Sequence, residues 1–258
     1  MTVNCRFYIL SFFTLTLLLS CANKRNILYF QDAELYNQSS IIYEDMAIQP
    51  NDILSIIVTT PVPEAAIPYN IQPIGGGGGA FNIEALKLQG YLVSDAGTII
   101  FPILGEIKVA NKNLLEVNQD IKKLLEDGGH LKDATVNTRL LNAKVTVLGD
   151  VIRPGTFSFS EQRITLPQAL GYAGDLIITG KRKEVLLIRE ENGLRTMHNI
   201  DLTTTRWFDS PYYYIQPNDI IVVNPNSTKV KTAGFIGNAS LVLTIASLIL
   251  SSVVIISR

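Results

Sequence analysis

The chain has 258 residues, of which 22 are basic and 23 are acidic, so its formal net charge is −1 at neutral pH. This balance leaves no basic surplus, and nucleic acid is therefore excluded as an expected partner. The 2 cysteines, Cys5 and Cys21, and the 2 histidines offer neither a disulfide framework nor a metal-ligand cluster, so no metal or cofactor is predicted.

An apolar run follows Arg6 and ends at Cys21. Its length is typical of the hydrophobic part of a secretory signal peptide and is short for a membrane span. The tetrapeptide Leu-Leu-Ser-Cys at 18–21 resembles the lipobox that bacterial lipoprotein signal peptidase cleaves. We predict a signal peptide at residues 1–20, a lipid on Cys21 and a lipid-anchored lead-in at residues 21–44. The alternatives are an uncleaved anchor or an ordinary signal peptide with a chance cysteine.

The hexapeptide Ile-Gln-Pro-Asn-Asp-Ile occurs twice, at residues 48–53 and 215–220. Its proline favours an extended preceding residue, and its Asn-Asp pair supplies turn chemistry. A β-branched run follows each copy, so each is predicted to be a turn that feeds a strand, at 53–59 and at 220–223. The repeat therefore indicates two related structural positions, unless one good turn has been reused by chance.

Residues 45–142 are predicted to form the first folded unit, a mixed sheet with one packed helix. Its segment 60–80 is rich in proline and contains a run of glycines, which indicates a flexible loop. This loop lacks the Lys-Ser/Thr pair of a phosphate-binding loop. Two short β-rich runs around the tetrapeptide 94–97 predict a hairpin, and residues 103–109 and 134–141 predict further strands.

The apolar pattern takes a helical period after Asn113. The apolar residues expected on one helix face are Leu114, Val117, Ile121, Leu124 and Leu125. Asn113 and Glu116 are typical of a capping box, and Gly128 and Gly129 end the pattern. An amphipathic helix is therefore predicted here.

Residues 143–226 are predicted to form a second unit, in the order strand, strand, helix and three strands. The expected strands are 145–148, 156–159, 185–189, 194–200 and 220–223. Thr165 and Gln168 are expected to cap the short helix, and Gly171 and Gly174 are expected to end it.

Residues 233–257 contain no charged side chain, and a helix of this length reaches roughly 37 Å, enough to cross a bilayer. Small and polar residues fall on one face of that helix, at Gly237, Ser240, Thr244, Ser247 and Ser251. In lipid, this stripe indicates either close helix packing or the lining of a water-filled pore. Both interpretations imply that the chain oligomerises.

Two blocks of the sequence resemble known domains. The stretches IQPNDILSIIV (48–58) and YLVSDAGTIIFPILGEIKV (91–109) resemble a polysaccharide export domain. The stretches GDVIRPGTF (149–157) and LPQALGYAGD (166–175) resemble a soluble-ligand-binding β-grasp (SLBB) domain. With the lipobox, the chain is similar to the outer-membrane polysaccharide export family.

The resemblance implies an α+β fold: a polysaccharide export domain, a β-grasp domain and a C-terminal transmembrane helix. It implies a lipoprotein of the outer membrane with most of its chain in the periplasm. Members of the family assemble into homo-oligomeric rings that export capsular or extracellular polysaccharide. The implied partners are other copies of the chain, the transported polysaccharide and, as a candidate, an inner-membrane polysaccharide copolymerase or tyrosine autokinase.

A rival hypothesis is a membrane-anchored periplasmic ligand-binding or scaffold lipoprotein, which predicts a monomer or a dimer. An enzyme is not expected, because His130 and His198 have no metal-ligand spacing and no nucleophile-elbow motif occurs. The aromatic residues at 207–208 and 212–214 are expected to belong to a core or a subunit interface, with the interface favoured, and stacking on sugar rings is the alternative.

Overall fold

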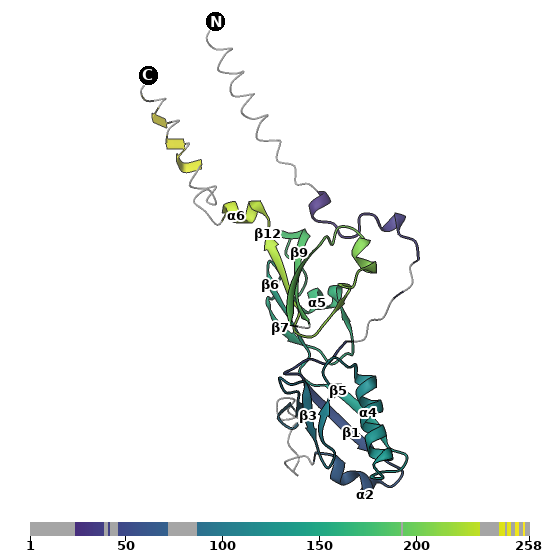
Figure 1. The fold of residues 1–258 in the computed structure, drawn as a ribbon. Coiled ribbons are helices and arrows are strands. Elements are labelled where there is room, and N and C mark those ends of the chain that lie inside the picture. The colour runs from purple at the N-terminus through teal and green to yellow at the C-terminus, as the bar shows by residue number, and fades with distance from the viewer. Residues whose placement is uncertain are drawn as a thin grey trace.

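A computed structural model describes residues 24–38, 41, 46–71, 87–191, 193–232, 243–245, 247–248, 251–252 and 255. Two folded units follow one another along the long axis of the molecule, and each has its own hydrophobic core (Figure 1). This arrangement agrees with the predicted α+β class, because sheets and helices both contribute to each core.

The first unit contains five strands and two α-helices within the described residues. They are β1 (Ile53–Thr59), α2 (Pro63–Ala66), β2 (Tyr91–Leu92), β3 (Thr98–Phe101), β4 (Gly105–Lys108), α4 (Leu114–Asp127) and β5 (Thr135–Leu140). β1 is the central strand of a three-stranded sheet in the order β2-β1-β5, and β3 pairs with β4. All of these ladders are antiparallel, so the expected mixed sheet is wrong for this unit. Periodicity predicts a strand but not the direction of its partner.

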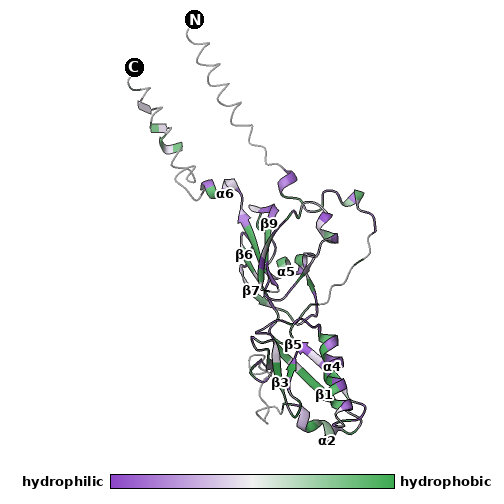
Figure 2. Cartoon of the chain, in the orientation of Figure 1, coloured by the Kyte–Doolittle hydropathy of each residue, from purple (hydrophilic) through white to green (hydrophobic). Residues whose placement is uncertain are grey.

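The core of the first unit lies between β1 and α4. Leu54, Ile56 and Val58 are buried and alternate with half-buried or exposed positions along β1. α4 contributes Val117, Ile121 and Leu125 to the same core, as predicted. Leu124, expected on this face, is instead 45% exposed, because it lies at the edge of the apolar stripe. Figure 2 shows the resulting contrast, with β1 largely hydrophobic and α4 two-sided.

Both ends of α4 follow the predicted chemistry. The Asn113 side chain accepts a bond from the Glu116 N–H, and the Glu116 carboxylate accepts one from the Asn113 N–H, which completes the capping box. After the helix, Gly129 has a φ of 69°, a left-handed conformation that suits glycine.

The hairpin expected around Ser94–Gly97 is only partly right. The chain does reverse there, because the Gly97 N–H bonds to the Ser94 carbonyl at 2.7 Å. The preceding strand β2, however, pairs with β1, and β3 pairs with β4 across Pro102–Leu104. Residues 98–101 therefore form their ladder with the strand that follows them, not with the one that precedes them.

The second unit contains a five-stranded sheet and α5. Its elements are β6 (Lys144–Gly149), β7 (Gly155–Ser158), β8 (Ile164–Thr165), α5 (Leu166–Tyr172), β9 (Gly180–Glu191), β10 (Leu194–Ile200), β11 (Tyr214–Ile215), β12 (Ile220–Pro225) and α6 (Ser227–Thr232). The order is β10-β9-β12-β6-β7, with β12 parallel to β6 and the other pairs antiparallel. The predicted capping box of Thr165 and Gln168 begins α5. The predicted element order is confirmed, with β8 and β11 as short additions.

The segment Tyr29–Tyr36, here called the N-terminal strap, lies on the second unit although it precedes the first in the chain (Figure 1). The Phe30 and Gln31 N–H groups donate to the carbonyls of Leu202 and Thr203 at 3.3 and 2.7 Å. Asp32 accepts from the Thr205 N–H at 2.7 Å. The second unit is therefore completed by a segment that lies upstream of the first.

The short helix α6 is tied to the second unit at the far end of the sheet. Asn226 accepts a bond from the Lys229 N–H, and the Lys229 ammonium forms an ion pair with buried Asp150. Burial raises the pKa of Asp150, but hydrogen bonds from Lys229 and Thr179 more than offset this and hold it below its ordinary value.

The predicted membrane-spanning segment 233–257 lies mostly outside the described residues. Those of its residues that are described, at 243–245, 247–248, 251–252 and 255, are helical. Within the described part of the chain, no helix has both the length and the apolar character needed to cross a membrane.

Candidate functional site

Both copies of the repeated hexapeptide lie where the two units meet. The first copy, Ile48–Ile53, leads into β1, and its Gln49 side chain donates a 3.3 Å hydrogen bond to the Glu190 carbonyl of the second unit. The second copy, Ile215–Ile220, leads into β12, and its Pro217 lines a pocket shared with the first unit. The repeat therefore marks this junction from both sides.

Each copy forms the same turn. The aspartate side chain accepts a 2.9 Å bond from the glutamine N–H, and the aspartate N–H donates a 3.2 Å bond to the glutamine carbonyl, in both copies. Asn51 and Asn218 have φ angles of 70° and 69°, in the left-handed region that asparagine tolerates better than most residues. The prediction of two related turns that feed strands is confirmed.

The aspartate of the second copy belongs to a closed ion pair. Asp219 is 1% exposed, and its carboxylate accepts bonds of 3.1 and 2.8 Å from the Arg189 guanidinium on β9. Arg189 also donates to the carbonyls of Pro211 and Tyr214. Burial raises the pKa of Asp219, and the guanidinium opposes that rise. This arrangement holds β9, β11 and the turn together.

The aspartate of the first copy has no such partner. Asp52 is 3% exposed, and no basic side chain in the described residues forms an ion pair with it. Its hydrogen bond comes from the Gln49 N–H. Burial raises the pKa of Asp52 to about 6, because the charged carboxylate is poorly solvated. The group is therefore a buried acceptor that is more easily protonated than an exposed aspartate.

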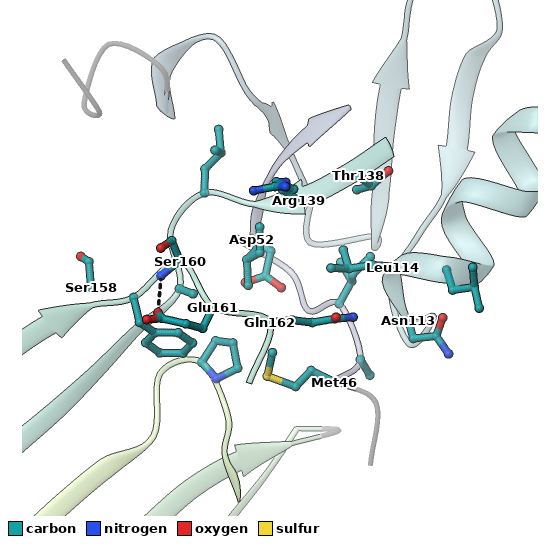
Figure 3. A pocket seen from close by; sticks show the side chains of 18 of the residues that line it. Met46, Asp52, Asn113, Leu114, Thr138, Arg139, Ser158, Ser160, Glu161 and Gln162 are labelled. Atoms are coloured by element: carbon teal, nitrogen blue, oxygen red, sulfur yellow. Dashed lines mark hydrogen bonds between the residues drawn. The ribbon is translucent and has the colours of Figure 1, made fainter. Parts of the chain in front are cut away.

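A pocket of about 940 Å³ opens beside Asp52. One wall belongs to the first unit and consists of Met46–Ile48, the start of α4 and the end of β5. The facing wall consists of Ser158–Gln162 and Tyr172 from the second unit. Figure 3 shows the Asp52 carboxylate within the space between β5 on one side and Met46 and Gln162 on the other. The pocket thus needs both units.

Two polar atoms of residues that line the pocket are buried and have no hydrogen-bond partner. They are Oγ1 of Thr138 and Oδ1 of Asn118. Thr138 lies opposite Ile56 in the β1–β5 ladder and is 5% exposed, while Asn118 lies in the second turn of α4. A buried polar group without a partner costs about 1–3 kcal/mol, and such groups are rare in folded proteins. The pocket itself is a candidate binding site because of its volume and its lining of apolar and polar side chains.

The composition of the pocket suits the binding of a polar molecule with apolar faces. Apolar side chains such as Met46, Leu114 and Phe159 form much of the lining. Three of the lining residues, Asp52, Thr138 and Asn118, carry side-chain oxygen atoms, of which those of Thr138 and Asn118 are fully buried. Mostly apolar walls with a few converging polar groups are typical of small-molecule sites, whose volumes are about 300–1,000 Å³.

The site residues proposed from the sequence lie elsewhere. Cys21 lies outside the described residues, as do Gly237 and Ser240 of the small-residue stripe. Thr244, Ser247 and Ser251 are described, and the two serine hydroxyls donate to the carbonyls of Thr244 and Ser247 at 2.8 Å. These two serine hydroxyls therefore bond to carbonyls of the preceding turn, and the role of the stripe in oligomer contacts stays a prediction.

The aromatic cluster expected at a subunit interface packs within the chain. Trp207 is buried in the core of the second unit, and Phe208 contacts Phe30 of the strap at a ring-centroid distance of 5.3 Å. The Tyr212 ring stacks on His198 at 4.0 Å. These contacts explain the cluster as the surface that receives the strap.

Sequence reasoning missed the pocket. It identified Asp52 as a turn residue, and Thr138 and Asn118 as parts of a strand and a helix. A polar residue at a core-facing position was the available signal: Thr138 follows the alternation that buries Ala134. That signal does not show which groups lack partners, because pairing depends on side chains far apart in the sequence.

Comparisons with known proteins agree with the architecture. Residues 42–141 match the family model described as polysaccharide biosynthesis/export protein. The chain is 30% identical over 202 residues to the EPS I polysaccharide export outer membrane protein EpsA of Ralstonia solanacearum, covering 76% of this chain and 52% of that protein. The EpsA protein of Ralstonia nicotianae is 31% identical over 205 residues, with coverages of 76% and 52%.

The chain therefore spans about half the length of the curated relatives it matches. The family match covers the whole first unit, from the turn before β1 to the residue after β5. The alignments with the relatives extend well beyond that unit, since they include about twice as many residues. Residues 42–141 therefore resemble the polysaccharide biosynthesis/export protein family.

Proposed function

We propose that this protein is a lipid-anchored outer-membrane subunit of a homo-oligomeric translocon that exports capsular or extracellular polysaccharide. The observation that carries the proposal is the match of the first unit to the polysaccharide biosynthesis/export family. The likeness to two proteins named as polysaccharide export outer membrane proteins supports it. The proposed role is transport, with no catalytic step.

The topology of the second unit supports its proposed assignment as an SLBB β-grasp domain. Numbered within the five-stranded sheet as β6, β7, β9, β10 and β12, the strands lie in the order 2-1-5-3-4. The first and last of these strands are parallel, and α5 crosses between the second and the third. This order supports the proposed β-grasp arrangement, as does the resemblance of 149–157 and 166–175 to SLBB domains.

The first experiment measures the mass of the detergent-extracted, lipidated protein by native mass spectrometry. A second sample is truncated after Asn226, which removes α6 and the charge-free segment but keeps both folded units. A closed ring of several copies that weakens on truncation supports the translocon, because heterologous contacts between identical subunits close by rotation. A stable monomer in both samples contradicts it and favours an anchored periplasmic ligand-binding module.

The proposed membrane attachments have separate tests. Cys21→Ser removes the proposed lipid site, which lies before both folded units, so folding should persist while recovery in the outer membrane is lost. Thr244→Lys places a charge on the stripe of the proposed membrane helix, where it should hinder insertion or ring formation by a cost of several kcal/mol. Unchanged membrane recovery of the first variant, or unchanged rings in the second, would contradict the respective assignment.

The proposed partners are the transported polysaccharide and an inner-membrane polysaccharide copolymerase or tyrosine autokinase. Crosslinking in intact cells followed by mass spectrometry of the purified chain tests the inner-membrane partner. Crosslinks should fall on the periplasmic units, since both precede the proposed membrane helix in the chain.

A further inference from the structure

We propose that the junction pocket binds an arginine side chain of a partner protein, whose guanidinium pairs with the Asp52 carboxylate. The chain itself supplies the template for this contact, because the same turn occurs twice. In the second copy, the aspartate of the turn holds the guanidinium of Arg189. In the first copy, the corresponding carboxylate lines a pocket. The site depends only on the turn, the carboxylate and the pocket, and not on the proposed function.

One oxygen of the Asp52 carboxylate is open to the pocket. The Gln49 N–H donates to Oδ2, and within the described residues no group bonds to Oδ1. Oδ1 differs from the partnerless oxygens of Thr138 and Asn118, because those two have no contact with solvent and Oδ1 keeps accessible surface. Figure 3 shows the carboxylate directed into the space of the pocket. A ligand in the pocket can therefore contact it.

The acidic groups of the lining favour a cationic ligand. Burial makes the charged form of Asp52 costly, and a bound cation offsets that cost by pairing with it. Glu161 on the facing wall is a second carboxylate. Its oxygens accept bonds from the Ser160 N–H at 3.0 Å and from the Tyr172 hydroxyl at 3.4 Å. A cation between the walls therefore meets carboxylate oxygens from both units.

The basic residues of the lining do not neutralise Asp52. Lys87 and Arg139 line the pocket, but neither forms an ion pair with this carboxylate. Arg139 lies between Thr138 and Leu140, which face the core side of the β1–β5 ladder, so its side chain leaves from the opposite face. The described part of the chain therefore supplies no cation to Asp52.

An arginine suits this pocket better than a lysine. A planar guanidinium gives two parallel hydrogen bonds to a carboxylate and is less strongly hydrated than an ammonium group. Arg189 contacts Asp219 in this way, at 3.1 and 2.8 Å. The apolar side chains of Met46, Leu114 and Phe159 can cover the aliphatic stem of an arginine. The volume of about 940 Å³ also leaves room for neighbouring residues of the partner segment.

We assign the arginine to a different protein because this chain has few arginines to offer to a second copy of itself. Most of those in the described residues already contact other groups of the chain. Arg182 and Arg189 are buried, and Arg195 pairs with Glu190. Arg206 is exposed, so it is the arginine to remove when a second copy is tested as the source.

The first test uses the full chain in detergent with methionine methyl groups labelled with carbon-13. Met46 lines the pocket, whereas Met197 is 61% exposed on β10 and serves as an internal control. The probe is N-acetyl-arginine methylamide, and the matched control is its citrulline analogue, which has a similar shape and no charge. The Met46 resonance should shift saturably with the arginine probe and at least tenfold more weakly with the citrulline analogue. The Met197 resonance should stay unchanged.

Variants and pH locate the contact. Asp52→Asn should weaken the arginine probe at least tenfold, and Asp127→Asn, at an exposed carboxylate outside the pocket, should leave the affinity unchanged. From pH 7.5 to pH 5 the wild-type affinity should fall about tenfold, because Asp52 has a pKa of about 6 and becomes protonated. Glu161→Gln should keep this pH dependence, and Asp52→Asn should lose it. A silent Met46, an equal response to both probes, or unaltered affinity in Asp52→Asn would overturn the proposal.

The second test identifies the partner in intact cells. A photoreactive amino acid replaces Leu115, which is 61% exposed and lines the pocket, or Leu194, which is 69% exposed on β10 outside the lining. The pocket position alone should crosslink to a different protein, at a peptide that contains arginine, and Asp52→Asn should abolish the crosslink. A crosslink to a second copy that Arg206→Gln abolishes would overturn the assignment to a different protein. A crosslink that does not depend on Asp52 would overturn the arginine contact.

Discussion

The two copies of the hexapeptide share their letters, their turn and their entry into a strand, yet one is a structural joint and the other faces a pocket. The register of the neighbouring strands explains the difference. Ile220 pairs with Ile188, so one step further along the ladder Asp219 faces Arg189. Leu54 pairs with Leu140, so two steps further Asp52 faces Asn142. A cation stands opposite one aspartate and a neutral amide opposite the other.

The neutral amide serves the backbone rather than the carboxylate. The Asn142 side chain accepts from the Ile53 N–H and donates to the Asn51 carbonyl, both at 2.9 Å. It therefore holds the turn in shape and leaves Asp52 available to the pocket. The comparison teaches that a repeated motif can conserve backbone geometry while the opposing strand decides its electrostatics.

The largest expected effect comes from breaking the ion pair between Arg189 and Asp219 in the second hexapeptide copy. Asp219→Asn leaves the Arg189 guanidinium buried beside a neutral side chain, which should lower the free energy of unfolding of the second unit by about 3–5 kcal/mol. Chemical denaturation followed by Trp207 fluorescence reports on this unit, because Trp207 lies in its core. A decrease of less than about 1 kcal/mol in the free energy of unfolding would show that the Arg189–Asp219 pair does not stabilise this turn.

The same substitution at Asp52, in the first hexapeptide copy, should raise the free energy of unfolding instead of lowering it. The folded-state pKa of Asp52 is raised from 3.8 to about 6, so folding favours its protonated form. The stability of the wild-type chain should therefore fall as pH rises from about 4 to about 6, through this group. Asp52→Asn should stabilise the first unit by about 1–3 kcal/mol at pH 7.5 and flatten this pH dependence.

Denaturation of the Asp52→Asn variant and of the wild-type chain across this pH range measures both effects. The matched control is Asp127→Asn, which should keep the wild-type pH profile because Asp127 is exposed. Destabilisation of Asp52→Asn at pH 7.5 would contradict the view of Asp52 as an unpaired buried carboxylate.

Replacing the left-handed asparagine of each turn should destabilise the protein by a smaller amount, which should be the same for both hexapeptide copies. Asn51→Ala and Asn218→Ala place a less tolerant residue at φ angles of 70° and 69°, and each should cost about 1 kcal/mol. Glycine at the same positions relieves the strain and serves as the control. Thermal unfolding of the variants measures the costs. A clear difference between the two alanine variants would show that the turns are less alike than their hydrogen bonds indicate.

The smallest effect should come from the unpartnered hydroxyl. Thr138→Val keeps the shape of the side chain and removes a buried group that has no hydrogen bond. Its free energy of unfolding should rise by about 1 kcal/mol, the lower end of the cost of an unpartnered buried polar group. Denaturation of this variant detects the change, and a loss of more than about 1 kcal/mol would reveal a hydrogen bond that Thr138 makes in the folded protein.

Local patterns were sufficient to predict much of the fold. Strand β1, both capping boxes and the paired turns depend on residues within a few positions of one another, and all were confirmed. Strand partners were harder to predict, because β2 pairs with β1, which is distant in the sequence, and not with the neighbouring β3. The pocket could not be predicted, because it depends on how the wall at Ser158–Gln162 meets β5.

The N-terminal strap was predicted only as a polar lead-in, for the same reason. Its partners Leu202, Thr203 and Thr205 lie about 170 residues further along the chain. The aromatic residues at 207–208 indicated an apolar surface that another segment covers. Nothing in the sequence identified Phe30 as the residue that packs on it.

The strap also determines how mechanical force enters the molecule. The strap attaches to the second unit near the start of the chain, and α6 attaches to it near the end, through Lys229 and Asp150. A pull between the two ends of the chain is therefore carried by the second unit alone. The first unit and the junction lie outside this load path, so tension between the two ends of the chain should leave them unloaded.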